Sequence, residues 1–328
     1  MVREQEEMQL LGFFGIIKES TKIIFTWRKI FSQITLALVL PLSFIILAYS
    51  QISDFLVEKI QHDQHALNHV KANNPKYNQL ANLVTSDIIE LCLSTVVYYV
   101  LVLIFSVLST STVVYTIACV YTSRSISFGR VMSVIPKVWK RLMITYLWSF
   151  LAVFIYIVSI IVTILICYLL FDLSHSPAIG VTLGFVLLIL FLFGFVYISV
   201  ILDLAGVISV LEDICGVQAM FKSKNLIKGK TGISIAINLL LAIGSMATHT
   251  MFRISMANGY GSGFLRSGVA VLCFLFLLQL SLFGLVAQSV IYFVCKSYHH
   301  ENINKLALLL AEYVPLQADD VKLEKVDV

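Results

Sequence analysis

Six uninterrupted apolar segments, each long enough to cross a bilayer, constrain this chain more than any other feature. A helix needs about 20 apolar residues to span the hydrocarbon core, because every backbone N–H and C=O must be paired within the segment. The composition agrees, with 59% hydrophobic and only 13% charged residues. We therefore predict an all-α membrane protein with six transmembrane helices. The segments lie at roughly 30–50, 91–120, 142–171, 179–202, 232–252 and 267–295.

The basic residues predict which way these helices cross the membrane. Because the number of spans is even, both termini lie on one side. Of the 23 Lys and Arg residues, 18 fall on the side of the termini and five fall in 51–86 and 253–266. Cytosolic segments are enriched in Lys and Arg. We therefore expect both termini in the cytosol. The protein itself would lie in the endomembrane system or in the plasma membrane.

The three cytosolic segments that precede helical hairpins share one pattern. In each, apolar residues recur in steps of three and four opposite a polar, basic face, which favours an amphipathic helix. One register superposes Ile16, Val131 and Ala219. The same register superposes Ser20, Ile135 and Ser223, four positions later.

This pattern predicts three pseudo-repeats within one membrane domain, residues 1–328. Each unit is a cytosolic amphipathic helix followed by a helical hairpin. Pro136 lacks an N–H, so we expect the second amphipathic helix to kink or restart there, with Trp139 at the depth of the membrane interface. The units are 1–121, with a luminal loop at 51–86, then 122–205 and 206–295, followed by a cytosolic tail at 296–328.

Three stretches resemble a known family over essentially the whole chain. They are FFGIIKESTKIIFTWRKIFSQITLALVLPLSFI, VYTIACVYTSRSISFGRVMSVIPKVWKRLM and VISVLEDICGVQAMFKSKNLIKGK. They resemble a plant family of multi-pass membrane proteins without established function, some of whose members are labelled poly(A)-binding-protein-binding. The resemblance implies a multi-pass membrane protein, and nothing in the sequence predicts contact with nucleic acid.

A more distant resemblance is to the membrane domain fused to some bacterial glycerophosphodiester phosphodiesterases. The chain ends 33 residues after Cys295, which is too short for the soluble hydrolase domain, so we do not expect hydrolase activity. The resemblance rests on Glu212, Gly216, Ala219, Ser223, Leu226, Gly229 and Lys230.

The basic cytosolic segments are the strongest candidate for a binding surface. An interfacial helix presents Lys and Arg to anionic lipid, at about 1 kcal/mol per residue near the surface. Two interpretations stay open: the residues only set topology, or they also bind anionic headgroups or a protein partner. The candidates are Arg124, Arg130, Lys137, Trp139, Lys140, Arg141, Lys222, Lys228 and Lys230.

Two further polar features are candidates for sites. Asp203 interrupts an apolar run, and a carboxylate within a span is costly and therefore a functional suspect. Its predicted place near the cytosolic interface favours a snorkelling or helix-junction role. In the luminal loop His62, His65 and His69 have helical spacing and are weak candidates for Zn²⁺ ligands, although a polar loop rich in His is the commoner case.

These observations favour a non-enzymatic membrane scaffold or a lipid-organising or trafficking factor that acts through membrane lipids. The alternative is a transporter or channel for a small solute, because internal repeats are common in transporters and Pro41 could break the first span. An intramembrane enzyme would need Asp203 and His249 to converge on a polar cavity. We expect no cofactor or metal, since the chain has no GxSxG, HExxH or phosphate-loop motif.

Overall fold

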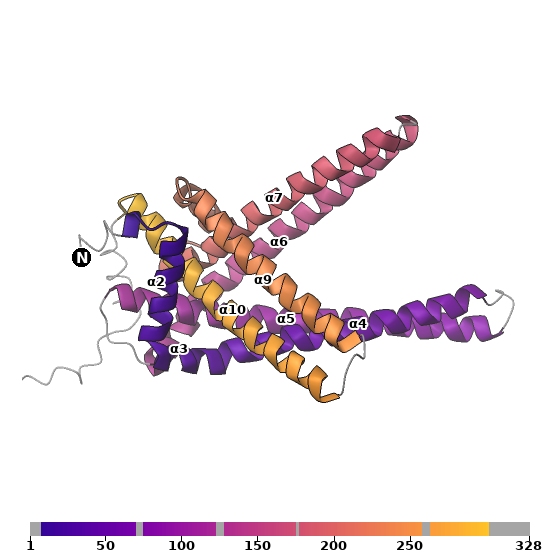
Figure 1. Ribbon diagram of the computed structural model, residues 1–328, viewed down its shortest axis with the longest axis horizontal. Helices are drawn as coiled ribbons and strands as arrows, with labels where there is room; N and C mark the ends of the chain where they lie inside the picture. Colours follow the sequence, from indigo (N-terminus) through magenta and orange to yellow (C-terminus); the bar gives the residue numbers. More distant parts are fainter. Residues whose placement is uncertain (1–7, 70–74, 123–127, 175–176, 258–262, 302–328) are drawn as a thin grey trace, which may run out of the picture. The chain divides into compact units, whose positions relative to one another are not determined.

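The computed structural model describes residues 8–69, 75–122, 128–174, 177–257 and 263–301, and within these ranges the regular elements are helices without a strand (Figure 1). The elements are α2 (Phe13–Thr26), α3 (Arg28–Ile34), the π-helix η1 (Thr35–Val39), α4 (Leu40–His69), α5 (Pro75–Tyr121), α6 (Phe128–Ser174), α7 (Pro177–Leu211), α8 (Val217–Leu226), α9 (Thr231–Ala257) and α10 (Gly263–Tyr298).

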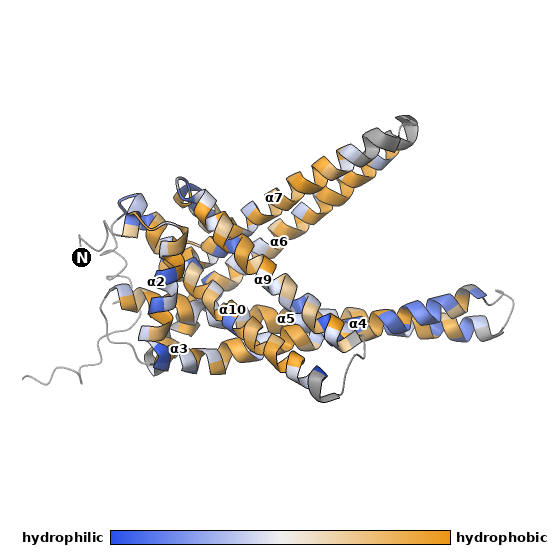
Figure 2. Cartoon of the chain, in the orientation of Figure 1, coloured by the Kyte–Doolittle hydropathy of each residue, from blue (hydrophilic) through white to orange (hydrophobic). Residues whose placement is uncertain are grey.

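Six of the described helical segments are long and apolar enough to cross a membrane, which confirms the prediction of an all-α chain with six such helices. Figure 2 shows α6 and α7 apolar along most of their length. Large apolar side chains such as Phe154 and Phe193 are exposed there, as expected where lipid takes the place of water. The segments are Arg28–Leu67, Tyr77–Tyr121, Val138–Leu169, Thr182–Leu211, Thr231–Met256 and Arg266–Tyr298.

The chain divides into two compact units that are not continuous in sequence. Unit 1 comprises residues 1–23, 110–236 and 286–328, and unit 2 comprises residues 24–109 and 237–285. Unit 1 contains α6, α7 and α8 complete, together with the C-terminal part of α10. Unit 2 contains α3, η1 and α4, most of α5, most of α9 and the N-terminal part of α10.

In unit 1, α6 and α7 form an antiparallel hairpin (Figure 1). The Tyr156 hydroxyl donates to the Phe191 carbonyl at 2.6 Å, and Thr145 Oγ1 lies 2.7 Å from Ser209 Oγ. Gly194 permits the first contact, because a Cβ there would lie 2.6 Å from the Tyr156 hydroxyl. Polar groups thus join two otherwise apolar helices at both of these levels.

The segment predicted as a second amphipathic helix does not form a separate helix. α6 runs without a break from Phe128 through Pro136 to Ser174, so the expected restart at Pro136 is wrong. A proline removes one N–H donor from the helix, and Pro136 is exposed, where water can satisfy the carbonyl left without its partner. No glycine or second proline follows within α6 to end the helix.

In unit 2 the predicted luminal loop at 51–86 is instead largely helical. α4 continues to His69 and α5 begins at Pro75, so the hairpin keeps its helical form through the polar residues that Figure 2 shows. Leu56, Ile60 and Val84 are buried in this region. Lys59 also pairs with Asp87 at 2.7 Å between the two helices. These contacts explain why a polar stretch does not become a loop.

The first span of unit 2 passes through one π-helical turn. Thr35–Val39 forms η1 directly before Pro41 in α4. Since Pro41 has no N–H to donate, the wider π-turn is a way to accommodate the unpaired carbonyl without ending the helix. The helical path therefore continues across the position where a break of the first span was considered.

Candidate functional site

The three segments that aligned in sequence bury matching positions. The aligned Ile16, Val131 and Ala219 are each at most 2% exposed. Four and seven positions later the residues are buried as well. These are Ser20, Ile135 and Ser223, then Ile23, Val138 and Leu226.

The opposite faces of α2 and α8 expose aromatic and basic side chains together. On α2, Phe14 is 81% exposed, and Lys18 and Lys22 follow at intervals of four residues. On α8, Phe221 is 63% exposed and Lys224 is exposed three residues later. Residues three and four apart share a helix face. Each helix therefore has an outward face that combines an aromatic ring with lysine.

A partly buried ion cluster joins the end of α7 to α8 and to the end of α10. Lys222 Nζ lies 2.6 Å from Glu212 Oε2, and Lys296 Nζ lies 3.0 Å from Oε1. The Tyr292 hydroxyl donates to the same Oε1 at 2.7 Å. Glu301 approaches both lysines, at 3.6 and 3.8 Å. The side chains of Lys296 and Glu212 are 8% and 12% exposed, so the charges neutralise each other away from solvent.

The titration of this cluster follows from its contacts. Burial by itself raises the pKa of Glu212, but the hydrogen bond from Lys222, the charge of Lys296 and the hydrogen bonds from Tyr292 and Lys296 outweigh it and hold that pKa below its ordinary value. For Lys222, burial lowers the pKa, and the hydrogen bond and charge of Glu212 outweigh this and raise it. Both groups are therefore held in their charged forms.

Two glycines of the 212–230 stretch adopt backbone conformations that other residues disfavour. Gly216 has φ 62° and ψ −134°, and a Cβ there would lie 3.0 Å from the Trp148 ring. Gly229 has φ 92°, and its Cβ would collide with the Tyr298 ring. Ser223 donates to the Ile201 carbonyl at 2.8 Å, across to α7. The residues of the distant resemblance therefore hold α8 in place.

Several predicted basic candidates are engaged within the protein. Arg141 donates to the Asp213 carboxylate and, at 3.3 Å, to the Glu212 carbonyl. Lys230 Nζ lies 3.4 Å from the Leu11 carbonyl and 5.6 Å from the centre of the Tyr298 ring. Lys222 belongs to the ion cluster.

The remaining candidates differ in exposure. Lys140 and Lys228 are exposed, and Trp139 is half-buried. Arg130 and Lys137 belong to α6, whereas Arg124 lies outside the described residues.

Asp203 lines a pocket in unit 1 that is about 290 Å³ in volume. α7 continues eight residues beyond Asp203 to Leu211, about 12 Å at the rise of an α-helix. The carboxylate thus lies two turns inside the end of the helix. The span was predicted to end at residue 202, so Asp203 lies deeper within the helix than expected. The segment 204–211 is apolar, so a single carboxylate does not end the helix.

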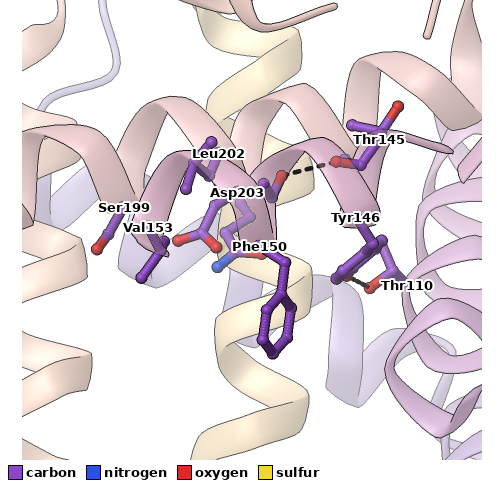
Figure 3. A pocket seen from close by; sticks show the side chains of 11 residues that line it. Thr110, Thr145, Tyr146, Phe150, Val153, Ser199, Leu202 and Asp203 are labelled. Atoms are coloured by element: carbon purple, nitrogen blue, oxygen red, sulfur yellow. Dashed lines mark hydrogen bonds between the residues drawn. The ribbon is translucent and has the colours of Figure 1, made fainter. Parts of the chain in front are cut away.

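Four helices contribute to this pocket. Figure 3 shows Asp203 and Phe150 close together, with Ser199 to one side and Tyr146 to the other. His249 is not among the residues that line the pocket, so the pairing required for the enzyme hypothesis is not found there. The lining residues are Thr110, Thr145, Tyr146, Ser149, Phe150, Val153, Ser199, Leu202, Asp203, Gly206 and Gln288.

The three histidines lie on α4, in the helical extension of the hairpin. His62 Nδ1 is 3.2 Å from the Asp63 carboxylate, and His65 and His69 are exposed. Among the residues that the structure describes, no three His, Cys, Asp or Glu side chains come together as a metal site.

Sequence reasoning did not single out Lys296, Tyr292 or Glu301. The only local signal was a lysine four residues after a tyrosine at the end of an apolar segment. Glu212, the partner of Tyr292 and Lys296, is 80 and 84 residues earlier in the chain, and Glu301 pairs with Lys222 and Lys296. A separation of that size leaves no periodic pattern.

The described residues define the class of the chain as all-α, with six helices long and apolar enough to span a membrane. A family model described as "Domain of unknown function (DUF8558)" matches residues 1–326, and the chain belongs to this family. No curated protein and no solved structure matches the chain.

Proposed function

We propose that this chain is a non-enzymatic multi-pass membrane protein that organises lipids on the cytosolic leaflet. Both termini lie in the cytosol, and three pseudo-repeated segments lead into helical hairpins. The observation that carries the proposal is the outward face of α2 and of α8, where Phe14 stands with Lys18 and Phe221 with Lys224.

This combination fits the surface of a bilayer. Aromatic rings are accommodated at the level of the headgroups, and lysines near the surface attract anionic lipid at about 1 kcal/mol each. The matching buried positions of the three segments support the pseudo-repeat, because they give each segment the same side toward the protein. Arg141, Lys222 and Lys230 are engaged within the protein, so the proposal rests on the exposed lysines.

The test measures enrichment of anionic lipid around the reconstituted protein. Vesicles of phosphatidylcholine contain a minor fraction of brominated phosphatidylserine, which quenches tryptophan fluorescence on contact. We expect K18Q, K224Q and K228Q together to reduce the enrichment more than tenfold, from about 1 kcal/mol per lysine. A matched control replaces Lys305, Lys322 and Lys325, which lie outside the described residues, and removes the same charge.

The two triple variants distinguish lipid enrichment by these three exposed lysines from a general effect of the net charge of the protein. Wild-type enrichment in the tail variant, together with its loss in the helix variant, supports the proposal. Unchanged enrichment in the helix variant, or an equal loss in both, overturns it.

One observation favours the alternative of a transporter or channel. Asp203 lies on a helix able to span the membrane and lines a pocket there, and ionisable residues within such helices often mark solute paths. Solute flux into proteoliposomes that is abolished by Asp203→Asn would rank this function first.

A further inference from the structure

Several polar side chains in the pocket around Asp203 already have partners within the protein. The Ser149 hydroxyl donates to the Thr145 carbonyl at 2.9 Å, and the Ser199 hydroxyl donates to the Phe195 carbonyl at 2.9 Å. Asp203 itself interacts within the protein, and the described residues that line the pocket include no basic one. These contacts favour a neutral ligand, because an anion would meet no cation and an ammonium group would compete for a carboxylate that is already engaged.

Most of the accessible surface of the pocket is apolar. Phe150, Val153 and Leu202 are its large apolar lining residues (Figure 3). Gly206 is buried, yet a Cβ added there meets no atom within 4 Å, so the space beside α7 is open. Phe150 is 51% exposed, so a ligand can reach the pocket from the outer face of α6.

The surrounding bilayer decides which neutral, apolar ligand can compete with bulk lipid. A hydrocarbon chain gains no hydrophobic free energy when it moves from lipid into an apolar pocket, because both exclude water. Affinity must therefore come from shape and from hydrogen bonds that hydrocarbon cannot offer. A rigid ring system also loses less conformational freedom on binding than a flexible chain does.

Three lining groups can bond one hydroxyl of such a ligand. The Gln288 carboxamide has N–H donors and an acceptor oxygen, so it can donate to a hydroxyl or accept from it. The Ser149 and Ser199 oxygens, whose protons are used within their own helices, keep lone pairs that can accept. The pocket thus suits a single neutral hydroxyl on an otherwise apolar molecule.

The depth of the pocket agrees with this chemistry. Trp148, directly before Ser149, is 44% exposed, and tryptophan is enriched where membrane helices reach the interface with water. Farther along α6 the same face exposes Phe154, Val158 and Ile161, at intervals of three and four residues. The volume of about 290 Å³ is at the lower end of ligand pockets, so it holds one end of a lipid while the rest lies along this stripe.

We propose that the pocket binds a sterol, with the sterol hydroxyl at Gln288 and the rings beside Phe150 and along the exposed stripe of α6. The proposal rests on the embedding of unit 1 in a membrane, which the proposed function includes. It does not depend on the lysine faces of α2 and α8.

The test measures binding of tritiated cholesterol to the full chain in nanodiscs of phosphatidylcholine, after subtraction of binding to empty nanodiscs. We expect saturable binding. Gly206→Leu fills the open space beside α7 and should weaken binding at least tenfold. Unchanged binding in Gly206→Leu, or the absence of saturable binding to the wild type, overturns the proposal.

A matched control uses another glycine of the same helix. Gly184 is exposed, lies outside the pocket lining and also has no atom within 4 Å of an added Cβ. Gly184→Leu should bind cholesterol as the wild type does. Equal losses in Gly184→Leu and Gly206→Leu overturn the assignment to the pocket.

A second variant tests the hydrogen bond and keeps the volume of the side chain. Gln288→Leu removes the amide, and the loss of one hydrogen bond should weaken cholesterol binding about two- to tenfold. This variant also keeps the proposal testable if Gly206→Leu does not fold. Unchanged binding in Gln288→Leu overturns the place assigned to the hydroxyl.

Two competitors separate the parts of the ligand. Cholestane has the rings without the hydroxyl, and octadecanol has a hydroxyl on a flexible chain. We expect neither to displace labelled cholesterol as unlabelled cholesterol does at equal concentration. Displacement by cholestane overturns recognition of the hydroxyl. Displacement by octadecanol overturns selection of the rings and would make the ligand a long-chain alcohol.

The experiment is separable from the proposed function. Gly206→Leu and Gln288→Leu should keep the enrichment of phosphatidylserine, and the triple lysine variant should keep the binding of cholesterol. Wild-type protein that binds no cholesterol while it still enriches phosphatidylserine overturns this inference alone.

Discussion

Lys296 and Glu212 are 84 residues apart in the chain, yet the Lys296 ammonium lies 3.0 Å from the Glu212 carboxylate. Tyr292, one helical turn before Lys296, shares the same carboxylate oxygen. The contact joins the ends of α7 and α10 within unit 1.

Removal of Glu212 should destabilise the protein strongly. Glu212→Leu leaves the buried Lys296 without its closest counter-ion, and breaking a buried ion pair from one side costs about 3–5 kcal/mol. The double variant Glu212→Leu with Lys296→Met removes both charges and should recover a large part of the loss. Thermal unfolding in detergent, followed by size-exclusion chromatography, measures both. A double variant no more stable than Glu212→Leu contradicts the argument.

The cluster also predicts how stability depends on pH. The pKa of Glu212 is lowered in the folded protein from an ordinary value of 4.5, so its contribution is present above that value and is lost as pH falls through the folded pKa. The pKa of Lys222 is raised from 10.5, so its contribution is present below 10.5 and is lost as pH rises through the folded pKa.

The measurement is the melting temperature of wild type and Glu212→Gln across this range. We expect the difference between the two proteins to be constant from about pH 5 to pH 10 and to shrink at both ends. A difference that grows on acidification is the opposite sign and rejects the assignment.

Alanine substitutions should affect stability differently at glycines with positive φ and at a glycine within a helix. Gly216→Ala and Gly229→Ala place a Cβ on residues with positive φ beside an aromatic ring, and each should cost about 1–3 kcal/mol. Gly206→Ala is the matched control. It lies within helix α7 with open space around its Cβ, and should be neutral or stabilising by up to about 1 kcal/mol. Melting temperatures of the three variants provide the check.

The helical extension of the α4–α5 hairpin should be visible in hydrogen exchange. Amides of 55–67 have helical hydrogen bonds in the structure and should exchange more slowly than those of an unstructured peptide of the same sequence. Leu56→Asp, which places a carboxylate at a 3% exposed position, should speed exchange there. Exchange at the unstructured rate in the wild type would restore the original prediction of a loop.

The expected orientation can be tested with single cysteines. In a cysteine-free background, His65→Cys and Lys140→Cys place a thiol at exposed positions on predicted opposite sides of the membrane. After selective permeabilisation of the plasma membrane, an impermeant maleimide should label endomembrane-resident Lys140→Cys at once. His65→Cys should require full solubilisation. Labelling in the reverse order would invert the predicted topology.

Features that leave a local pattern in the sequence could be predicted, whereas contacts between residues far apart in the chain could not. Six apolar segments are visible because each span must satisfy its own backbone, independent of its neighbours. The α4–α5 extension was predicted as a loop because only a few buried residues, such as Leu56 and Val84, stabilise it among polar ones. Mean polarity does not distinguish that helix from a loop.

The candidate site shows the same division. Asp203 was found because a carboxylate in an apolar run is conspicuous, although its depth required the end of α7 at Leu211. Lys222 was one candidate for a lipid contact, and in the structure it pairs with Glu212, which lies outside α8. The residues of the pocket around Asp203 come from several helices, and so do those of the Glu212 cluster. The spacing of residues along a single helix therefore cannot predict either group.

The order of synthesis gives the Glu212 cluster a further consequence. Glu212 leaves the ribosome before Lys222, and Lys296 follows only when α10 is nearly complete. Until then the nascent chain carries a carboxylate whose second cation has not yet been made. We expect the charge of Glu212 to be fully neutralised only once α10 has inserted into the membrane. A chain truncated before Val286 would lack Lys296, and we expect cellular quality control to recognise it.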